Sequence, residues 1–221
     1  MSRRIGEGEY YHVYNRGVEK RLIFIDDADR WRFITLLMAF QGDVFHSHIS
    51  RLVPFAKHRR FDIDFFQDTL KDRKIELICF CLMLNHFHFI LKETQEGGIS
   101  KFMQRLADAY TKYFNLRHGR SGHLFGGRFQ SIHIDKNEYL NYLSAYIHLN
   151  PRELAKWRGK EIEYPWSSFQ DFVKENRWGQ LLSNPIILEQ FENGYEYRNF
   201  VEDTPIKEKL EKGYLLDYGE H

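Results

Sequence analysis

The chain has 221 residues, of which 43% are apolar and 29% are charged, and its formal net charge at pH 7 is +1. This composition indicates a globular protein with one sizeable core and excludes a largely disordered chain. No stretch approaches the roughly eighteen apolar residues of a membrane-spanning helix, the first residues hold no apolar signal core, and two cysteines are too few for a disulfide framework. We therefore expect a cytoplasmic protein that does not enter a membrane.

The charged residues are distributed unevenly. Between Lys101 and Ile134 there are six Lys or Arg residues and one acid, Asp108, whereas nine acids and four bases follow from Ile186 onward. A nearly neutral protein with one basic face can still attract phosphates. An ordinary solvated helix face explains the same asymmetry equally well, so charge alone does not assign a function.

The first half of the chain predicts a strand, a helix and a hairpin. Residues 9–16 alternate in the way a strand requires. Asp26 and Asp27 are typical helix N-caps, and residues 28–40 carry apolar side chains at helical spacing. Residues 75–82 and 86–92 are short apolar segments separated by a brief turn, which predicts a central hairpin.

The next segment predicts a helix, a strand and a further helix. Gly97, Gly98 and Ser100 precede a helix over residues 101–116, and a glycine-rich loop covers residues 119–127. A strand over residues 128–134 follows. Asp135 is the expected N-cap of a third helix, which Pro151 ends.

This order of elements predicts an α+β protein with a ferredoxin-like split βαββαβ antiparallel sheet, followed by the third helix. We expect residues 1–155 to form one domain and residues 156–221 to form a helical C-terminal extension packed on it. Residues 42–73 are too long for a plain loop and are expected to form a basic, partly helical insertion. The residues that make it look basic are His46, His48, Arg51, Lys57, His58, Arg59 and Arg60.

His86 and His88 are the most informative residues of the hairpin. Side chains two apart on a strand point to the same face, so both imidazoles should project together while Phe87 packs into the core behind them. Two imidazoles fixed on one rigid face are the beginning of a metal site.

Tyr146 and Asn150 lie four residues apart on the third helix and so share one face. A tyrosine hydroxyl is a poor nucleophile at its free pKa of roughly 10, but beside a divalent cation it can attack a phosphodiester and form a phosphotyrosine. Tyr139 and Tyr142 lie on nearly the same stripe. For these two we favour the ordinary interpretation, that they are amphipathic core residues.

Several motifs together resemble a known family. In order, and over about three-quarters of the chain, they resemble the one-tyrosine HUH transposases, and most of all the REP-associated tyrosine transposases. The motifs are YHVYNRG at 11–17, LMLNHFH at 82–88, FQS at 129–131, YIHLNP at 146–151 and WSS at 166–168.

The resemblance implies a DNA transposase that cleaves and rejoins single-stranded or hairpin DNA through a covalent 5′-phosphotyrosine. His86 and His88 match the pair that binds Mg²⁺ or Mn²⁺, Tyr146 matches the nucleophile, and Asn150 matches the residue that completes the metal shell. The implied partner is palindromic-repeat DNA, and a homodimer is a further candidate partner. No nucleotide cofactor is expected. Our candidates for contacts with the DNA backbone are Arg105, Lys112, Arg117, Arg120 and Arg128.

Two departures bear on this assignment. The family usually carries proline where this chain has Leu84, so the entry to the histidine strand is expected to bend differently. Asn150 precedes Pro151, which disfavours helical geometry at that residue.

Two alternatives stay open at this point. Cys79 and Cys81 could join His86 and His88 in a structural zinc site, although the cysteines also suit an apolar strand as small core residues. A protein with the same fold could bind single-stranded nucleic acid without cutting it. Four further histidines, His12, His123, His133 and His148, are expected to be isolated and satisfied by hydrogen bonds.

Overall fold

A computed structural model describes residues 6–42 and 66–205 of the chain. Its centre is a four-stranded antiparallel sheet in the order β2-β3-β1-β4. The strands are β1 (Tyr10–Arg16), β2 (Ile75–Leu82), β3 (His86–Glu93) and β4 (Gln130–Ile134). This order and the sequence of elements confirm the expected split βαββαβ fold.

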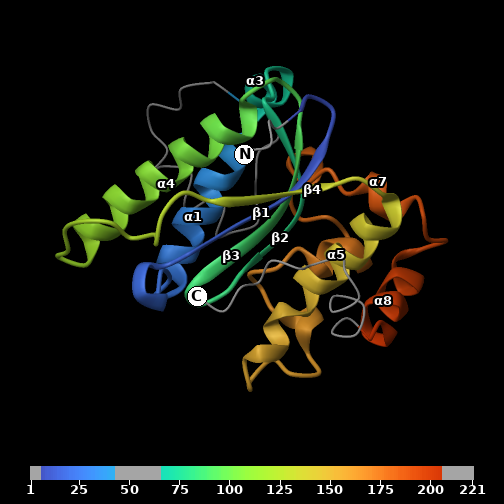
Figure 1. Cartoon of the computed structure of the whole chain (residues 1–221). Helices are drawn as coiled ribbons and strands as arrows, with labels where there is room; N and C mark the ends of the chain where they lie inside the picture. The colour runs from blue at the N-terminus through green and yellow to red at the C-terminus, as the bar shows by residue number, and fades with distance from the viewer. Residues whose placement is uncertain (1–5, 43–65, 206–221) are drawn as a thin grey trace.

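The helices form layers on the two faces of the sheet. Figure 1 shows α1 (Asp27–Ala39) and α4 (Gly98–Arg117) beside each other on one side, and α5 (Asn137–Leu149) with α8 (Gly194–Asp203) on the other. Strand alternation fits this arrangement, because Phe87 packs at 5.2 Å from Phe33 of α1, measured between ring centroids. The intervening residues of β3, including His86 and His88, therefore face the α5 side.

Two helix starts show how local chemistry sets the boundaries. The Asp26 carboxylate accepts hydrogen bonds from the amides of Ala28 and Asp29, as expected for the N-cap of α1. Helix α4 begins three residues earlier than predicted. The Glu93 carboxylate at the end of β3 accepts from the amides of Gly97 and Ile99, so a side chain from another element caps this helix.

The predicted cap of the third helix was wrong. Helix α5 begins at Asn137 with Lys136 as its N-cap, not Asp135. At the other end α5 stops at Leu149 and continues directly into a 3₁₀ turn over Asn150–Glu153, so Pro151 ends the α-helix without ending the helical path of the chain. Pro151 fits there because the first turn of a helix does not need its amide.

The chain after this turn forms short helices, α6 (Phe169–Val173) and α7 (Pro185–Leu188), before α8. It lies along the edge strand β2, where the amide of Leu82 donates to the carbonyl of Trp166 and the amide of Ser168 donates to that of Phe80. The extension thus covers the edge strand, which would otherwise present unpaired backbone groups.

Most of the predicted insertion lies outside the described residues, and with it the basic residues and histidines assigned to it. Its described end contains α3 (Gln67–Lys71), and Gly42 forms a β-bridge with Arg73. Within residues 6–42 and 66–205, no helix is long and apolar enough to span a membrane.

Candidate active site

His86 and His88 lie side by side on β3, with ring centroids 5.1 Å apart and side chains that are almost fully buried. Burial, with a smaller contribution from the charge of Arg16, lowers the pKa of His86 to about 4. Burial and the neighbouring imidazoles of His12 and His86 hold the pKa of His88 well below its ordinary value. Both rings are therefore neutral at pH 7 and each keeps one nitrogen lone pair.

Hydrogen bonds fix which nitrogen of His86 carries the proton. Asn85 donates from Nδ2 to the carbonyl of Lys20 at 3.0 Å, which turns its Oδ1 toward His86 Nδ1 at 2.7 Å. Since Oδ1 can only accept, the ring proton lies on Nδ1 and the lone pair of Nε2 points into the site. Such outer hydrogen bonds are what orient metal-binding histidines.

Asn150 presents an oxygen to the same space. Its Nδ2 donates to the carbonyl of Tyr146 at 3.0 Å, and its Oδ1 lies 3.4 Å from His86 Nε2. Two atoms that can only accept thus face each other, an arrangement that a cation between them would satisfy. Asn150 has helical φ and ψ of −49° and −40° despite Pro151, because the 3₁₀ turn continues from α5.

His88 has a partner in His12, so the expectation that His12 is isolated was wrong. His12 Nε2 lies 3.0 Å from His88 Nδ1, and their rings stack at an interplanar angle of 22°. Burial lowers the pKa of His12 to about 3, so neutral His12 can accept the Nδ1 proton of His88. The available signal was strand pairing: Tyr14 is opposite His88, so His12 lies diagonally across on the same face.

The three tyrosines of α5 have different surroundings. The half-buried ring of Tyr146 lies edge-on to His88, with centroids 5.7 Å apart. Tyr142 packs instead on Phe200 of α8, at 5.5 Å. Tyr139 is buried, and burial raises its pKa to about 12. Tyr146 is thus in ring contact with His88, one of the two proposed metal-binding histidines.

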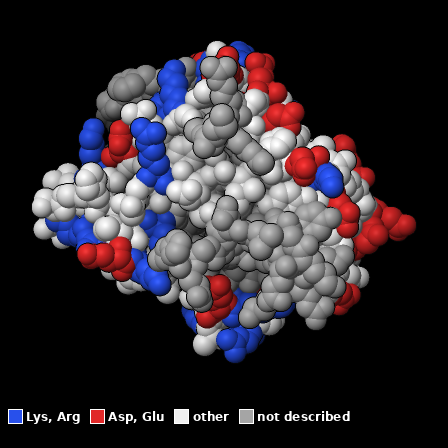
Figure 2. All heavy atoms as spheres, viewed as in Figure 1, with Lys and Arg blue, Asp and Glu red and all other residues white. Residues whose placement is uncertain are grey.

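A cleft of about 860 Å³ opens in front of the histidines, between β1, the start of β4 and the glycine-rich loop. Arg16, Lys20 and Arg128 line it together with one acid, Glu19. This lining favours an anionic ligand such as a phosphodiester. Figure 2 shows acidic side chains gathered on the side of α7 and α8 and basic ones more frequent on the side of α4.

The five candidates for DNA-backbone contacts are not equivalent. Lys112 and Arg128 are exposed at clefts. The guanidinium of Arg117 is held by Asp26 and Asp29, with a 2.7 Å contact to each Asp26 oxygen. Arg105 donates to the carbonyl of Gly42 and lies over the Phe40 ring, and Arg120 donates to Asn115.

The zinc alternative is not supported. Cys79 and Cys81 are buried free thiols, and burial raises both pKa values, which disfavours the thiolate that zinc requires. In the described part of the chain, no three His, Cys, Asp or Glu side chains gather as metal ligands. The remaining donor set is His86, His88 and the amide oxygen of Asn150. Its neutral N and O donors leave room for water and phosphate, as a catalytic Mg²⁺ or Mn²⁺ site requires.

Comparisons with known proteins agree with the sequence motifs. Residues 51–150 match the family model described as "Transposase IS200 like", and this range contains His86, His88, Tyr146 and Asn150. A search of curated proteins finds no match. A solved structure of a REP-associated tyrosine transposase bound to a REP hairpin has a similar fold, with a TM-score of 0.52 and 15% identity, over 84% of this chain and 92% of that one. The resemblance and the fold class are confirmed.

Proposed function

We propose that this protein is a DNA transposase that cleaves and rejoins single-stranded or hairpin DNA with Tyr146 as nucleophile. The observation that carries the proposal is the convergence of His86 Nε2, Asn150 Oδ1 and the Tyr146 ring around His88. The match to IS200-like transposases supports it, because the matched range includes all four residues.

In this mechanism Tyr146 Oη attacks the scissile phosphorus and its phenol proton passes to water. The bond from phosphorus to the 3′ oxygen of the preceding nucleotide breaks, and that oxygen takes up a proton and leaves as a 3′ hydroxyl. The 5′ phosphate stays on Tyr146. Rejoining is the reverse reaction with another 3′ hydroxyl, so the phosphotyrosine conserves the bond energy and no nucleotide cofactor is required.

His86, His88 and Asn150 would hold a Mg²⁺ or Mn²⁺ ion, which when bound withdraws charge from the phosphate oxygens. Asn85 and His12 keep the two imidazoles in the tautomers that leave Nε2 available. Arg16, Lys20 and Arg128 at the cleft attract the phosphodiester backbone.

We propose hairpin or single-stranded DNA as the substrate. The structural neighbour was solved with a REP hairpin, and a single strand exposes both its bases and its phosphates to a cleft of this kind. An intact duplex hides its bases, so a hairpin should bind much more tightly than a blunt duplex of the same sequence.

Labelled oligonucleotides test the proposal through the polarity of the reaction. In the presence of Mn²⁺, a hairpin with a flanking single strand should form a protein adduct that resists denaturation and carries a label placed at the 3′ end. The same label at the 5′ end should leave with the released strand. Tight hairpin binding without any adduct would favour the non-catalytic binding protein, and an adduct carrying the 5′ label would contradict the assigned chemistry.

A further inference from the structure

The leaving oxygen of the proposed reaction needs a proton. When the bond between phosphorus and the 3′ oxygen breaks, that oxygen keeps the electron pair and becomes a strongly basic alkoxide unless it is protonated. A side chain that donates a proton as the bond breaks accelerates such a reaction by roughly 10²- to 10⁴-fold. His86, His88 and Asn150 are assigned to the metal and Tyr146 to the attack, so the proton comes from another group or from water.

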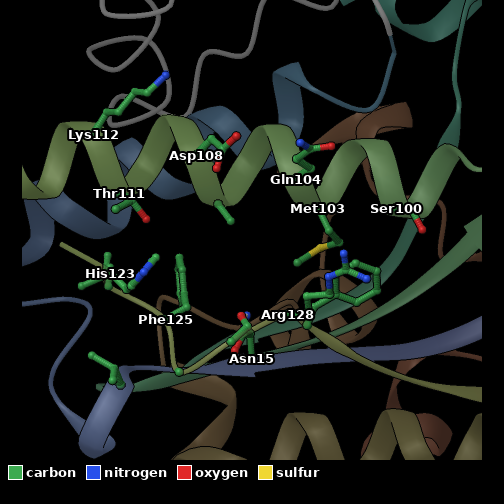
Figure 3. A pocket seen from close by; sticks show the side chains of 16 residues that line it. Asn15, Ser100, Met103, Gln104, Asp108, Thr111, Lys112, His123, Phe125 and Arg128 are labelled. Atoms are coloured by element: carbon green, nitrogen blue, oxygen red, sulfur yellow. The ribbon is translucent and has the colours of Figure 1, made fainter. Parts of the chain in front are cut away.

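Tyr14 of β1 lies beside the proposed metal site. It is directly opposite His88 in the antiparallel pair of β1 and β3, so both side chains project from the same face of the sheet. Figure 3 shows the next residue, Asn15, on the other face, toward α4. The Tyr14 ring is 5.8 Å from that of His88 and 4.9 Å from that of His12, measured between centroids. Contacts with both histidines thus hold a half-buried phenol at the site.

Two tyrosines therefore approach the same histidine from different elements. Tyr146 comes from α5 and lies edge-on to His88 at 5.7 Å, and it is not among the residues that line the cleft in front of the histidines. Tyr14 comes from the sheet and lines that cleft. In a displacement at phosphorus, the attacking and leaving oxygens lie roughly in line on opposite sides. A phosphate attacked by Tyr146 from the α5 side would therefore release its 3′ oxygen toward the cleft and Tyr14.

Other groups at the cleft suit this task less well. Each proposed metal-binding imidazole has its one proton on the nitrogen that faces away from the site. The guanidiniums of Arg16 and Arg128 do not give up their protons. Lys20 has an acidic proton, but its side chain is exposed on a turn. A phenol keeps its proton at neutral pH and is far more acidic than an alcohol, so a tyrosine can serve as a general acid.

We propose that Tyr14 is the general acid of the cleavage reaction and donates its phenol proton to the departing 3′ oxygen. As the bond from Tyr146 Oη to phosphorus forms, the bond from phosphorus to the 3′ oxygen breaks, and that oxygen takes the electron pair and the proton of Tyr14. The phenolate of Tyr14 recovers a proton from water, which has received the one lost by Tyr146. In rejoining every step runs backward, so Tyr14 accepts the proton of the attacking 3′ hydroxyl. The inference rests on the proposed function, because it assigns a role in that reaction.

A sulfur substitution in the DNA tests this role apart from effects on folding or binding. Once the cleavage position is mapped with the parent protein, a second hairpin is made in which sulfur replaces the 3′ oxygen at that phosphate. A thiolate leaves without a proton, so cleavage of the sulfur hairpin does not need a general acid. Formation of the 3′-labelled adduct is timed in Mn²⁺ with protein in excess. We expect Tyr14→Phe to slow the oxygen hairpin about a hundredfold and to cleave the sulfur hairpin nearly as fast as the parent does.

Two further variants serve as controls. Tyr10→Phe alters the same strand and face, but Tyr10 packs on Lys92 and does not line the cleft, so both hairpins should react at the parent rate. Lys20→Met removes the other acidic proton at the cleft and should slow both hairpins alike, through weaker binding.

The outcomes separate the inference from the reaction on which it rests. If Tyr14→Phe slows both hairpins equally or slows neither, or if sulfur rescues Lys20→Met instead, the inference is overturned while the proposed function stands. If the parent protein forms no adduct with either hairpin, the proposed function itself fails.

Discussion

The side-chain oxygen of Asn150 lies 3.4 Å from Nε2 of His86, and neither atom has a proton to donate to the other. A second hydrogen bond orients each side chain. The Asn150 amide donates to the carbonyl of Tyr146, and the His86 ring donates to the side chain of Asn85. Two fixed lone pairs that face each other are unfavourable unless a cation lies between them. This relationship underlies the predictions for the metal.

Removal of either histidine should weaken binding of Mn²⁺. We expect His86→Ala and His88→Ala each to weaken Mn²⁺ affinity at least tenfold in isothermal titration calorimetry. His133→Ala is the matched control, because His133 pairs with Glu9 away from the site and should leave affinity unchanged. Unaltered Mn²⁺ binding in both site variants would show that the ion binds elsewhere.

His12→Phe should weaken Mn²⁺ binding without unfolding the protein. Phenylalanine keeps a ring of similar size against His88 but removes the acceptor for its Nδ1 proton. Outer hydrogen bonds of this kind are typically worth 10- to 100-fold in metal affinity. A variant that binds Mn²⁺ as tightly as the parent would show that His12 serves packing alone.

The metal-free protein should lose stability as the pH falls below about 6.5. Burial lowers the pKa of both His12 and His148 to about 3, so the folded state binds no proton at these rings where the unfolded state already does. The unfolded state is therefore favoured as pH decreases, by about 2 kcal/mol per histidine at pH 5. Urea unfolding in EDTA at pH 7.5 and pH 5 measures this, and His148→Gln should show a smaller drop. Equal stability at the two pH values would contradict these burial effects.

Tyr197 of α8 ties the C-terminal extension to the helix that carries Tyr146. Its hydroxyl lies 2.7 Å from His148 Nδ1 and donates to Ser144 at 2.9 Å, all in the core. Tyr197→Phe should lower the free energy of unfolding by about 1–3 kcal/mol, because buried polar groups lose their partners. Tyr195→Phe, in the same helix but exposed, should leave it unchanged. Similar values for the two variants would show that the network does not stabilise α5.

The sequence predicted what short-range periodicity determines. The period of two on β3 placed His86 and His88 together. The helical spacing of four placed Asn150, which lies in the 3₁₀ turn directly after α5, one turn after Tyr146. The strand order also followed from the sequence of elements, because short connections leave few topologies for an antiparallel sheet.

Contacts that depend on distant parts of the chain were not predictable in this way. The pairing of His12 with His88 spans 76 residues and needs the register of β1 against β3. The engagement of Arg117 by Asp26 likewise joins two elements that meet only in the folded protein. The sequence shows that Arg117 is positively charged but does not show that Asp26 and Asp29 bind it.

The central claim is that Tyr146 is the nucleophile of a metal-dependent phosphotyrosine reaction, and one comparison tests it most directly. A hairpin labelled at its 3′ end is incubated with Mn²⁺ and each of three variants, Tyr139→Phe, Tyr142→Phe and Tyr146→Phe, and the denaturation-resistant adduct is quantified. Each change removes one oxygen and keeps the ring, so differences report chemistry once thermal melting confirms folding. The account predicts that Tyr146→Phe alone forms no adduct. An adduct retained by Tyr146→Phe and lost in either of the other variants would contradict it.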